Sequence, residues 1–380
     1  MKNILLLGGA GFIGTKLSEA LLAKGYKVTI LDCFSEQVHG KNYKESYLYR
    51  QVQESVNLVY GNINNTELLL SLLKKNEVVI HLASETGTAQ SMYRLQRYTE
   101  VNIGSVAVLM DVLINNKTNI KKVILGSSRA VYGEGKYKDG QGGYVYPNLR
   151  SKANLANNKF DLINEEKGEV LHYEATDEDS LINPVSIYGF SKYAQEQLVK
   201  ITCQTYGIDY CILRYQNVYG PGQSLLNSYT GVLNVFASRA ILNKTLEIFE
   251  DGKGIRDYIY IDDAVDATIL ALENEDANNQ TFNVGTGVGT SIWDAAVSIS
   301  RSLEKEVVCN VSGIYRYGDI RHSLADIHKI KNALDFTPKY SFKEGLTEFG
   351  KWVMTQDIRS ESSDDIFDEN LQKGVLRIKN

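Results

Sequence analysis

The sequence has few of the residues that build metal sites and disulfide frameworks. Its four cysteines, Cys33, Cys203, Cys211 and Cys309, form no C-x-x-C pair, and its five histidines are not clustered. This scatter argues against a zinc site and against a disulfide-stapled fold. We therefore expect no bound metal and a reduced, cytoplasmic compartment.

Long apolar runs and an excess of positive charge are also missing. The apolar run near the start, Ile4 to Leu7, is far too short for a membrane span or a signal-peptide core, and no later run approaches membrane length. The formal net charge of -5 offers no broad attraction to nucleic acid or to an anionic membrane. We expect neither as a partner, so an anionic ligand has to be held by a few local cations.

With 380 residues, of which 43% are hydrophobic and 23% charged, the chain has the composition of a soluble globular protein with room for two lobes. It opens with an apolar run, a glycine-rich loop that contains Gly8, Gly11 and Gly14, an amphipathic stretch to about Lys24, and a second apolar run over 28–31. This order predicts a βαβ unit whose glycines let a dinucleotide pyrophosphate approach the helix N-terminus. The alternative for the glycines is a plain strand-to-helix turn.

Asp32 closes the second predicted strand. A carboxylate at this place accepts hydrogen bonds from the adenosine ribose hydroxyls and repels a 2′-phosphate. Residues 33–36 supply no cation, so the sequence favours NAD over NADP as the cofactor.

Strand and helix patterns continue to alternate. Strands are predicted near 57–60, 78–82, 122–125 and 210–213, and helices near 66–75, 98–114 and 185–205. This alternation is typical of an α/β fold with a doubly wound parallel sheet, which binds ligands beyond the carboxyl ends of its strands. Ser127 and Ser128 follow one strand and either cap its exit or deliver a hydroxyl to that crevice.

A tyrosine and a lysine stand four residues apart in "YGFSK", at Tyr188 and Lys192. Residues at this spacing are neighbours on one face of a helix. The same spacing recurs at Tyr132 and Lys136, where two intervening glycines argue against a helix. A cation about 5 Å away at an effective dielectric of about 20 stabilises a phenolate by roughly 3 kcal/mol. We expect Lys192 to lower the pKa of Tyr188 by about two, so that Tyr188 acts as an acid/base near neutral pH.

These motifs, together with "VIHLAS", "GSSRAVYG", "LRYQNVYGPG" and "GIRDYIYIDD", resemble the extended short-chain dehydrogenases/reductases of the nucleotide-sugar epimerase and dehydratase branch. The resemblance spans about residues 1–355. The segments "QVHG", "GTAQSMY", "RYQNVYGPGQSLLNSYTGV" and "GDIRHSLAD" are closest to dTDP-L-rhamnose 4-epimerases. The resemblance implies a Rossmann-type NAD domain with a smaller C-terminal substrate lobe.

The resemblance also implies roles for single residues. Tyr188 would be the catalytic acid/base, Lys192 its partner, and Ser128 the hydroxyl that polarises the sugar oxygen. Substrate contacts are implied for Ser128, Arg129, Asn217, Arg256, Arg316 and Asp319, although arginines are more often solvated surface residues. Cofactor contacts are implied for Gly8, Gly11, Phe12, Ile13, Gly14, Asp32, Asn62, Ile63, Leu82, Ala83, Ser84, Tyr188 and Lys192.

Two features depart from the family pattern. The chain has Asn62 where the family usually has an aspartate near the adenine, and an amide can still donate and accept hydrogen bonds. An insertion over about 134–182 is rich in glycine, asparagine and charge. It is either a tolerated surface excursion or a cover over the sugar pocket. It carries no cysteine, so no metal is inherited.

We expect an NAD domain over 1–218, a substrate lobe mainly over 219–355 with some segments possibly returning to the first domain, and a polar tail over 356–380 whose start is disordered and whose last turns dock. The function implied is 4-epimerisation of a nucleotide-diphosphate sugar, of the dTDP-L-rhamnose and dTDP-6-deoxy-L-talose type. Family dehydratases have an acidic pair where this chain has Arg129 and Ala130. The alternatives are a dehydratase or reductase on the same fold and a non-catalytic NAD sensor. The predicted helices 98–114 and 185–205 match those that pair in family homodimers.

Overall fold

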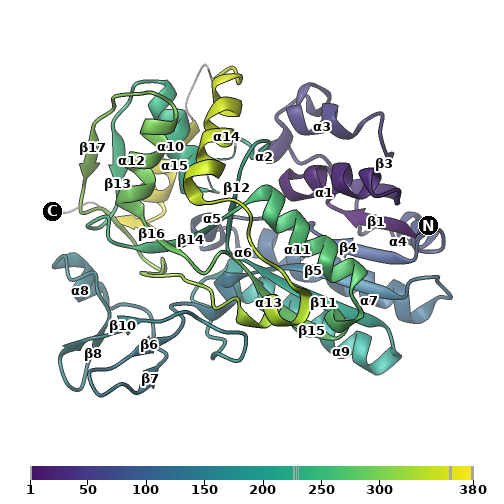
Figure 1. Ribbon diagram of the computed structural model, residues 1–380, viewed down its shortest axis with the longest axis horizontal. Helices are drawn as coiled ribbons and strands as arrows, with labels where there is room; N and C mark the ends of the chain where they lie inside the picture. The colour runs from purple at the N-terminus through teal and green to yellow at the C-terminus, as the bar shows by residue number, and fades with distance from the viewer. Residues whose placement is uncertain (1, 226, 228, 230, 359–361, 378–380) are drawn as a thin grey trace.

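A seven-stranded parallel sheet forms the centre of the protein in the computed structural model, which describes residues 2–225, 227, 229, 231–358 and 362–377 (Figure 1). Every pair of neighbouring strands runs in the same direction. The predicted α/β fold with a doubly wound parallel sheet is therefore confirmed. From one edge to the other the strands are β15 (Gln280–Val284), β11 (Asp209–Tyr215), β5 (Lys122–Ser128), β4 (Val78–His81), β1 (Asn3–Leu7), β2 (Lys27–Asp32) and β3 (Asn57–Tyr60).

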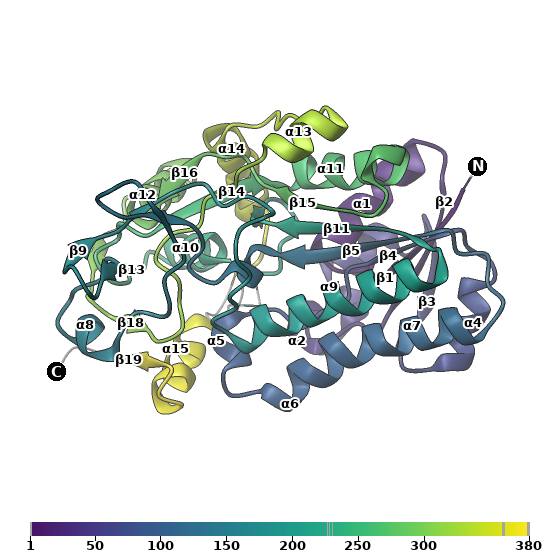
Figure 2. The ribbon, with the colours of Figure 1, turned by 90° about the horizontal axis from the view of Figure 1, so that it is seen from below.

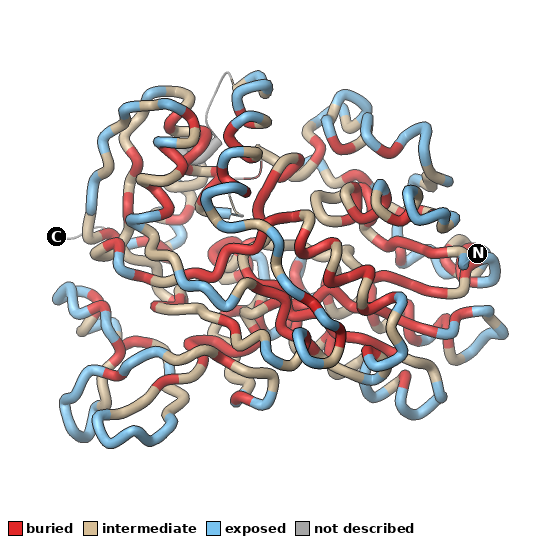
Figure 3. The backbone as a smooth tube through the Cα atoms, viewed as in Figure 1, coloured by how far each residue is buried: buried red, intermediate tan, exposed pale blue. Residues whose placement is uncertain are grey.

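Helices cover both faces of this sheet because its central strands are apolar on both sides (Figures 2 and 3). In β1, Leu5 and Leu7 belong to one buried cluster, and Ile4 and Leu6 belong to the other. The first cluster includes residues of α4 (Thr66–Leu73), α7 (Ser105–Asn115) and α9 (Ile187–Tyr206). The second includes residues of α1 (Phe12–Ala23), α11 (Ile261–Glu273) and α13 (His328–Leu334).

Two predicted elements differ from what the structure has. Strand β5 extends to Ser128, so Ser127 and Ser128 form its last two residues and do not follow it. The predicted helix 98–114 is interrupted: α6 (Leu95–Tyr98) leads into a π-helical segment, η2 (Thr99–Gly104), before α7 begins. Short helices elsewhere are α2 (Glu36–His39), η1 (Tyr43–Glu45), α3 (Tyr47–Val52), α5 (Thr88–Ser91), η3 (Arg129–Tyr132) and η4 (Glu275–Ala277).

A second, smaller lobe lies beyond the carboxyl ends of the sheet (Figure 1). Its three-stranded sheet contains β12 (Asn217–Tyr219), β14 (Ile255–Tyr260) and β16 (Gly289–Ser291), and a further pair joins β13 (Leu246–Ile248) to β17 (Cys309–Val311). Helices α10 (Val232–Ile241), α12 (Ile292–Ser302) and α14 (Phe342–Met354) pack with these strands. In the sequence between β14 and β16, the chain returns to the central sheet and forms β15 next to β11.

The insertion folds into short strands and one helix at the edge of this lobe: β6 (Tyr137–Lys138), β7 (Tyr144–Val145), α8 (Lys152–Ala156), β8 (Ile163–Asn164), β9 (Glu169–Val170) and β10 (His172–Tyr173). Its own apolar cluster is small, with Tyr137, Leu162 and Leu171 buried. Because three large side chains bury little apolar surface, other contacts have to hold the insertion in place.

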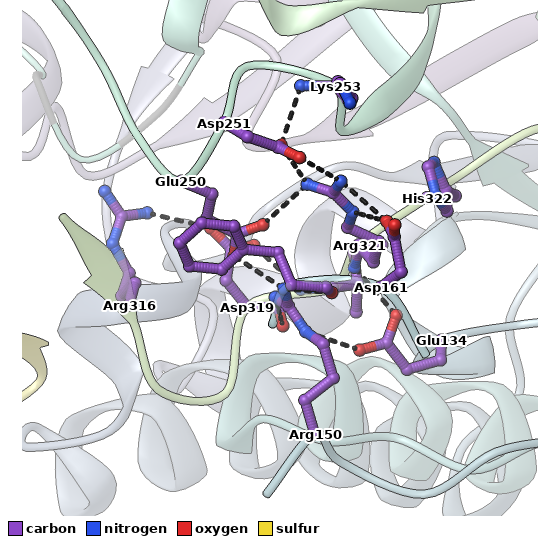
Figure 4. Close-up of polar contacts among 12 residues, drawn as sticks. Glu134, Arg150, Asp161, Glu250, Asp251, Lys253, Arg316, Asp319, Arg321 and His322 are labelled. Carbon is purple, nitrogen blue, oxygen red and sulfur yellow. Dashed lines mark hydrogen bonds and ion pairs between the residues drawn. The ribbon is translucent and has the colours of Figure 1, made fainter. Parts of the chain in front are cut away.

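Those contacts are ion pairs between the insertion and the second lobe, drawn in Figure 4, in which the guanidinium groups are buried. Arg150 donates to Glu250 at 2.7 Å and to the carbonyl of Asp319 at 3.0 Å. Arg321, of which 1% is exposed, pairs with Asp161 at 2.7 Å and with both carboxylate oxygens of Asp251. The insertion is therefore bound to the lobe by two buried guanidinium groups.

The C-terminal tail forms one helix and one strand in the part that the structure describes. Residues 359–361, where we expected disorder, lie outside the described residues. After them, α15 (Ser362–Gln372) leads to β19 (Leu376–Arg377), which pairs antiparallel with β18 (Tyr315–Arg316). The last turns of the tail therefore dock on the second lobe.

The cysteines are all free, and among the described residues no group of histidine, cysteine, aspartate and glutamate side chains is placed to hold a metal ion. Within the same residues, no helix has the length and apolarity needed to cross a membrane.

Replacing Arg321 by leucine is expected to lower the free energy of unfolding by about 2–3 kcal/mol, because the charge-assisted hydrogen bonds of its buried guanidinium to Asp161, Glu250 and Asp251 are lost. Urea denaturation measures this loss. Lys351→Ala is the matched control: its pair with Glu348 is exposed at both ends, so it should cost less than about 1 kcal/mol. A loss as small as the control's for Arg321→Leu would contradict the structural role of this network.

Candidate active site

A cavity of about 580 Å³ lies between the carboxyl ends of the parallel strands and the second lobe. Its walls come from the glycine-rich loop, the ends of β4 and β5, the first turns of α9, and the lobe strands β12 and β14. The predicted residues that line it are Gly8, Gly11, Phe12, Ile13, Gly14, Leu82, Ser84, Ser128, Arg129, Tyr188, Lys192, Asn217, Arg256, Arg316 and Asp319. The structure thus brings together most of the residues named from the sequence.

The three glycines of the opening loop differ in what requires them. A Cβ on Gly8, whose φ is +74°, would lie 2.5 Å from the backbone of Ala83, and a Cβ on Gly14 would lie 2.5 Å from the carbonyl oxygen of Gly9. A Cβ on Gly11 would meet only the carbonyl oxygen of Gly8, at 3.4 Å. Packing within the chain therefore requires glycine at positions 8 and 14, whereas a side chain at position 11 would extend into open space towards the cavity.

Helix α1 begins at this open space. Gly11 is its N-cap and no side chain caps the helix. The first N–H groups of α1 are thus directed to the cavity, where a pyrophosphate is stabilised by them and by the helix dipole. The loop therefore fits the pyrophosphate of a dinucleotide.

Four predicted cofactor residues, Asp32, Asn62, Ile63 and Ala83, are not among those that line the cavity. Asp32 ends β2, and its carboxylate accepts hydrogen bonds from the backbone N–H groups of Ala10 (3.0 Å) and Phe34 (2.9 Å). Asn62 follows β3, the neighbour of β2, and accepts from the N–H of Asn64 at 2.9 Å. Both polar side chains thus lie at the ends of adjacent strands, and Asp32 contacts the glycine-rich loop through Ala10.

Helix α9 carries Tyr188 and Lys192 into the cavity. Its N-cap Ser186 accepts from the N–H of Gly189, and its C-terminal end is the left-handed Gly207. The hydroxyl of Ser91 accepts from the N–H of Tyr188 at 3.0 Å, which joins the first turn to α5. The Ser128 hydroxyl lies beside the Tyr188 phenol and lowers its pKa. The sequence-predicted trio therefore meets where β5 ends and α9 begins.

The predicted lowering of the Tyr188 pKa by Lys192 is wrong for the polypeptide by itself. Burial raises the pKa of Tyr188, and the hydrogen bond from Ser128 and the charge of Arg129 only partly oppose it. Burial also lowers the pKa of Lys192 to about 7, against the attraction of Glu196. The reason is that both groups are buried, and burial disfavours the charged form of each.

Glu196 lies one turn beyond Lys192 on α9 and is held in a buried network. It accepts from the Ser127 hydroxyl at 2.5 Å and forms two hydrogen bonds with the guanidinium of Arg214 on β11. Arg214 donates in turn to the phenol of Tyr132. Tyr132 is therefore part of a structural network that fixes α9 against β5 and β11. The short helix η3 ends at Tyr132, so Tyr132 and Lys136 do not share a helix, as the glycines between them predicted.

Three arginines face the cavity around one carboxylate. Arg256 and Arg316 lie 3.6 and 3.7 Å from Asp319, and Arg129 donates to the side-chain oxygen of Asn217 at 3.0 Å. Burial acts to raise the pKa of Asp319, yet these guanidinium groups hold it below its usual value. Burial and the charge of Arg256 lower the pKa of Arg129 to about 10. Glu250 also lines the cavity, but it is paired with Arg150 and Arg321. The three arginines around Asp319 therefore leave this end of the cavity with a net positive charge, which suits an anionic ligand.

Sequence reasoning missed several residues of the cavity. Tyr258 and Gln223 line it with a phenol oxygen and an amide oxygen that have no partner among the described residues. Tyr258 is the residue two after Arg256 on β14, so strand alternation could have placed it on the same face. Ile366, Phe367, Asn370 and Leu376 of the tail also line the cavity, and no sequence motif marked them. In contrast, no residue of 134–182 lines it, so the insertion is not a wall of this cavity.

Comparison with known proteins agrees with this site. A family model described as the NAD dependent epimerase/dehydratase family matches residues 4–150 and 164–285. A dTDP-L-rhamnose 4-epimerase of Burkholderia thailandensis is 35% identical over 354 residues, which cover 93% of this chain and 95% of that protein.

Solved structures agree as well. The UDP-glucuronic acid 4-epimerase of Bacillus cereus, in complex with UDP-glucuronic acid and NAD, is 27% identical with a TM-score of 0.75, covering 93% of this chain and 99% of that one. The UDP-glucose 4-epimerase of Thermotoga maritima with UDP-glucose is 30% identical with a TM-score of 0.73, covering 93% and 98%. The cavity, the parallel sheet and these matches together identify the chain as an enzyme of the NAD-dependent epimerase/dehydratase family, with NAD as its cofactor.

Proposed function

We propose that the enzyme interconverts a nucleotide-activated hexose and its C4 epimer, with dTDP-L-rhamnose and dTDP-6-deoxy-L-talose as the pair. The observation that carries this proposal is that the Ser128 hydroxyl and the Tyr188 phenol line one cavity side by side, between its glycine-lined and its arginine-lined parts. A sugar carbon placed there is in reach of an acid/base and of the cofactor at once. The substrate pair rests on the relative from Burkholderia thailandensis.

Each residue has a role in this reaction. When bound, NAD supplies reversible hydride acceptance at the sugar C4. Tyr188 takes the proton from the C4 hydroxyl as the 4-keto sugar forms and returns it after the sugar has turned over in the cavity. Ser128 hydrogen-bonds the reacting oxygen, and Lys192 holds the nicotinamide ribose. No proton or hydride is lost, so the reaction leaves no net NADH.

Arg129, Arg256 and Arg316 hold the diphosphate in this proposal, together with Asn217, and Asp319 contacts the nucleotide ribose. Their net positive charge supports the assignment. Gly8, Gly11 and Gly14 cradle the NAD pyrophosphate, with Phe12 and Ile13 at the start of α1. Asp32 binds the adenosine ribose, Asn62 and Ile63 flank the adenine, and Leu82, Ala83 and Ser84 follow β4 beside the dinucleotide.

Dehydration fits this site less well. A dehydratase needs an acid and a base beside the reacting hydroxyl to move protons at neighbouring carbons. The two residues after Ser128 are Arg129, which is buried and bonded to Asn217, and Ala130. Neither side chain can serve as the acid or the base of a dehydration, since the guanidinium stays protonated and alanine has no ionisable group.

We also propose a homodimer that pairs α7 and α9 with their copies. Large apolar side chains are exposed on this side, among them Leu95 on α6, Phe190 and Ile201 on α9. Light scattering at micromolar concentration should give the mass of two chains, and the mass of one chain would contradict the proposal.

Gly11→Ala should fold normally and bind NAD at least about 10-fold more weakly, because its Cβ enters the open space in front of α1. Gly14→Ala is the contrasting variant: its Cβ meets the Gly9 backbone at 2.5 Å, so the protein should lose about 1–3 kcal/mol of stability. Thermal unfolding and calorimetric NAD titration separate the two effects. An unchanged NAD affinity in Gly11→Ala would count against the proposed cradle.

Incubation with dTDP-L-rhamnose should yield its C4 epimer, detected by NMR spectroscopy, while absorbance at 340 nm shows no accumulation of NADH. UDP-glucose and UDP-glucuronic acid, the ligands of the two solved relatives, serve as competing substrates. Formation of a 4-keto-6-deoxy product, or a steady need for added NADPH, would replace the proposal with dehydration or reduction.

The pH dependence of turnover tests the roles of Tyr188 and Ser128. The hydrogen bond from Ser128 lowers the pKa of Tyr188, and Tyr188 must be deprotonated to accept the C4 hydroxyl proton. Ser128→Ala should therefore raise that pKa and move the acid limb of the kcat profile to higher pH. Tyr188→Phe, the control, should reduce kcat by about 10² or more and abolish this limb while NAD still binds. If the acid limb of the kcat profile of Ser128→Ala stayed in place or moved to lower pH, the roles assigned to Ser128 and Tyr188 would be refuted.

A further inference from the structure

The C-terminal segment 366–377 forms a wall of the cavity that holds Ser128 and Tyr188. Ile366, Phe367 and Asn370 of α15 and Leu376 of β19 are among the lining residues. The family model ends at residue 285, so the family match does not account for this wall.

The segment is held on both sides of the cavity. On the lobe side, Leu376 pairs with Arg316 in the β18–β19 ladder, and the N–H of Tyr317 donates to the carbonyl of Val375 at 3.1 Å. On the other side, Glu369 accepts from the phenol of Tyr229, which itself lines the cavity, and lies 3.7 Å from Arg94. These contacts fix α15 across the cavity.

One polar atom in this wall lacks a partner. Asn370 is 4% exposed, and its amide oxygen accepts no hydrogen bond from the described residues. A buried amide oxygen without a donor costs roughly 1–3 kcal/mol, so such atoms in native proteins are usually satisfied by a ligand or by water. The placement of Asn370 in the cavity points to a donor on the bound molecule.

The surroundings indicate which part of a nucleotide sugar this donor belongs to. Phe249, a lining residue of the lobe, has the guanidinium of Arg316 5.5 Å from its ring centre and the ring of Phe367 6.4 Å away. Phe367 and Asn370 are three residues apart and so share one face of α15. Next to Arg316, which holds the diphosphate in the proposed function, the site therefore has aromatic rings and an amide oxygen. The rings can pack against a nucleotide base, and the amide oxygen can accept a hydrogen bond from it.

We propose that Asn370 reads the pyrimidine of the nucleotide sugar, with its amide oxygen accepting the N3–H of a uracil or thymine ring that packs against the edge-to-face pair of Phe249 and Phe367. The C-terminal segment is thereby a specificity element of the substrate site. This inference rests on the proposed function, because it takes the ligand to be a nucleotide sugar whose diphosphate lies at Arg256 and Arg316.

Calorimetric titration with dTDP and with UDP tests the base contact without any turnover. Asn370→Leu should weaken the binding of these nucleotides about 5- to 10-fold, the loss of one neutral hydrogen bond, and should weaken dTDP-L-rhamnose by the same factor. In assays, KM should rise with kcat unchanged. Gln372→Leu, the same change at an exposed amide of α15, is the matched control and should leave all affinities unchanged.

Asn370→Ala is the second variant if leucine impairs folding, and its thermal unfolding is measured alongside. Wild-type affinity for dTDP and UDP in both Asn370 variants would overturn the proposal. A loss for dTDP-L-rhamnose but not for dTDP would also overturn it, because the amide would then contact the sugar. If the wild-type enzyme bound neither nucleotide, the proposed function would fall together with this inference, whereas normal wild-type binding with unaffected variants removes the inference alone.

Discussion

The short segment Asp319 to Arg321 is the constraint on which the substrate side of this enzyme depends. Its backbone carbonyls orient Arg256, whose guanidinium donates to the oxygens of Ile320 (2.9 Å) and Arg321 (3.0 Å). The segment is fixed in turn by Arg150 from the insertion and by the buried side chain of Arg321 (Figure 4). The insertion therefore contributes to the site without lining it. The insertion fixes the segment 319–321, and this segment in turn orients Arg256. The positive charge of this cavity wall is therefore in place before a ligand binds.

Burial makes the charges at the other end of the cavity sensitive to what binds there. The chain alone keeps Tyr188 protonated and brings the pKa of Lys192 to about 7. A cation that enters the site lowers the pKa of a neighbouring phenol, and oxidised nicotinamide is a cation. Ser128, Arg129 and the cofactor charge thus act in the same direction on Tyr188. In the proposed mechanism, this arrangement couples the base strength of Tyr188 to the presence of the cofactor.

The parts of this structure that follow from local patterns could be predicted from the sequence. The glycine-rich loop, the parallel sheet, the strand that ends at Ser128 and the helix that begins before Tyr188 each follow from a local pattern of strand ends and helix starts. The family resemblance then implied that Ser128 and Tyr188 meet. The wall made by Asn370 and the ion pairs of Arg150 and Arg321 could not be predicted. The pairs of Arg150 and Arg321 with Glu250 join residues that lie far apart in the sequence and meet only through tertiary packing. The polar tail carries no periodic signal that would place Asn370 at the cavity. The pKa of Tyr188 was predicted in the wrong direction because spacing reveals a neighbour but not the depth of burial.

The central claim is that a hydride leaves and returns to C4 while no C–H bond is exchanged with solvent. The direct test is to run the interconversion to equilibrium in heavy water and to examine the product by NMR spectroscopy and mass spectrometry. The account predicts a C4 epimer with no carbon-bound deuterium, since the only proton that passes through Tyr188 is the hydroxyl proton. Deuterium at C3 or C5 would show that a carbon acid is deprotonated during turnover and would contradict the mechanism.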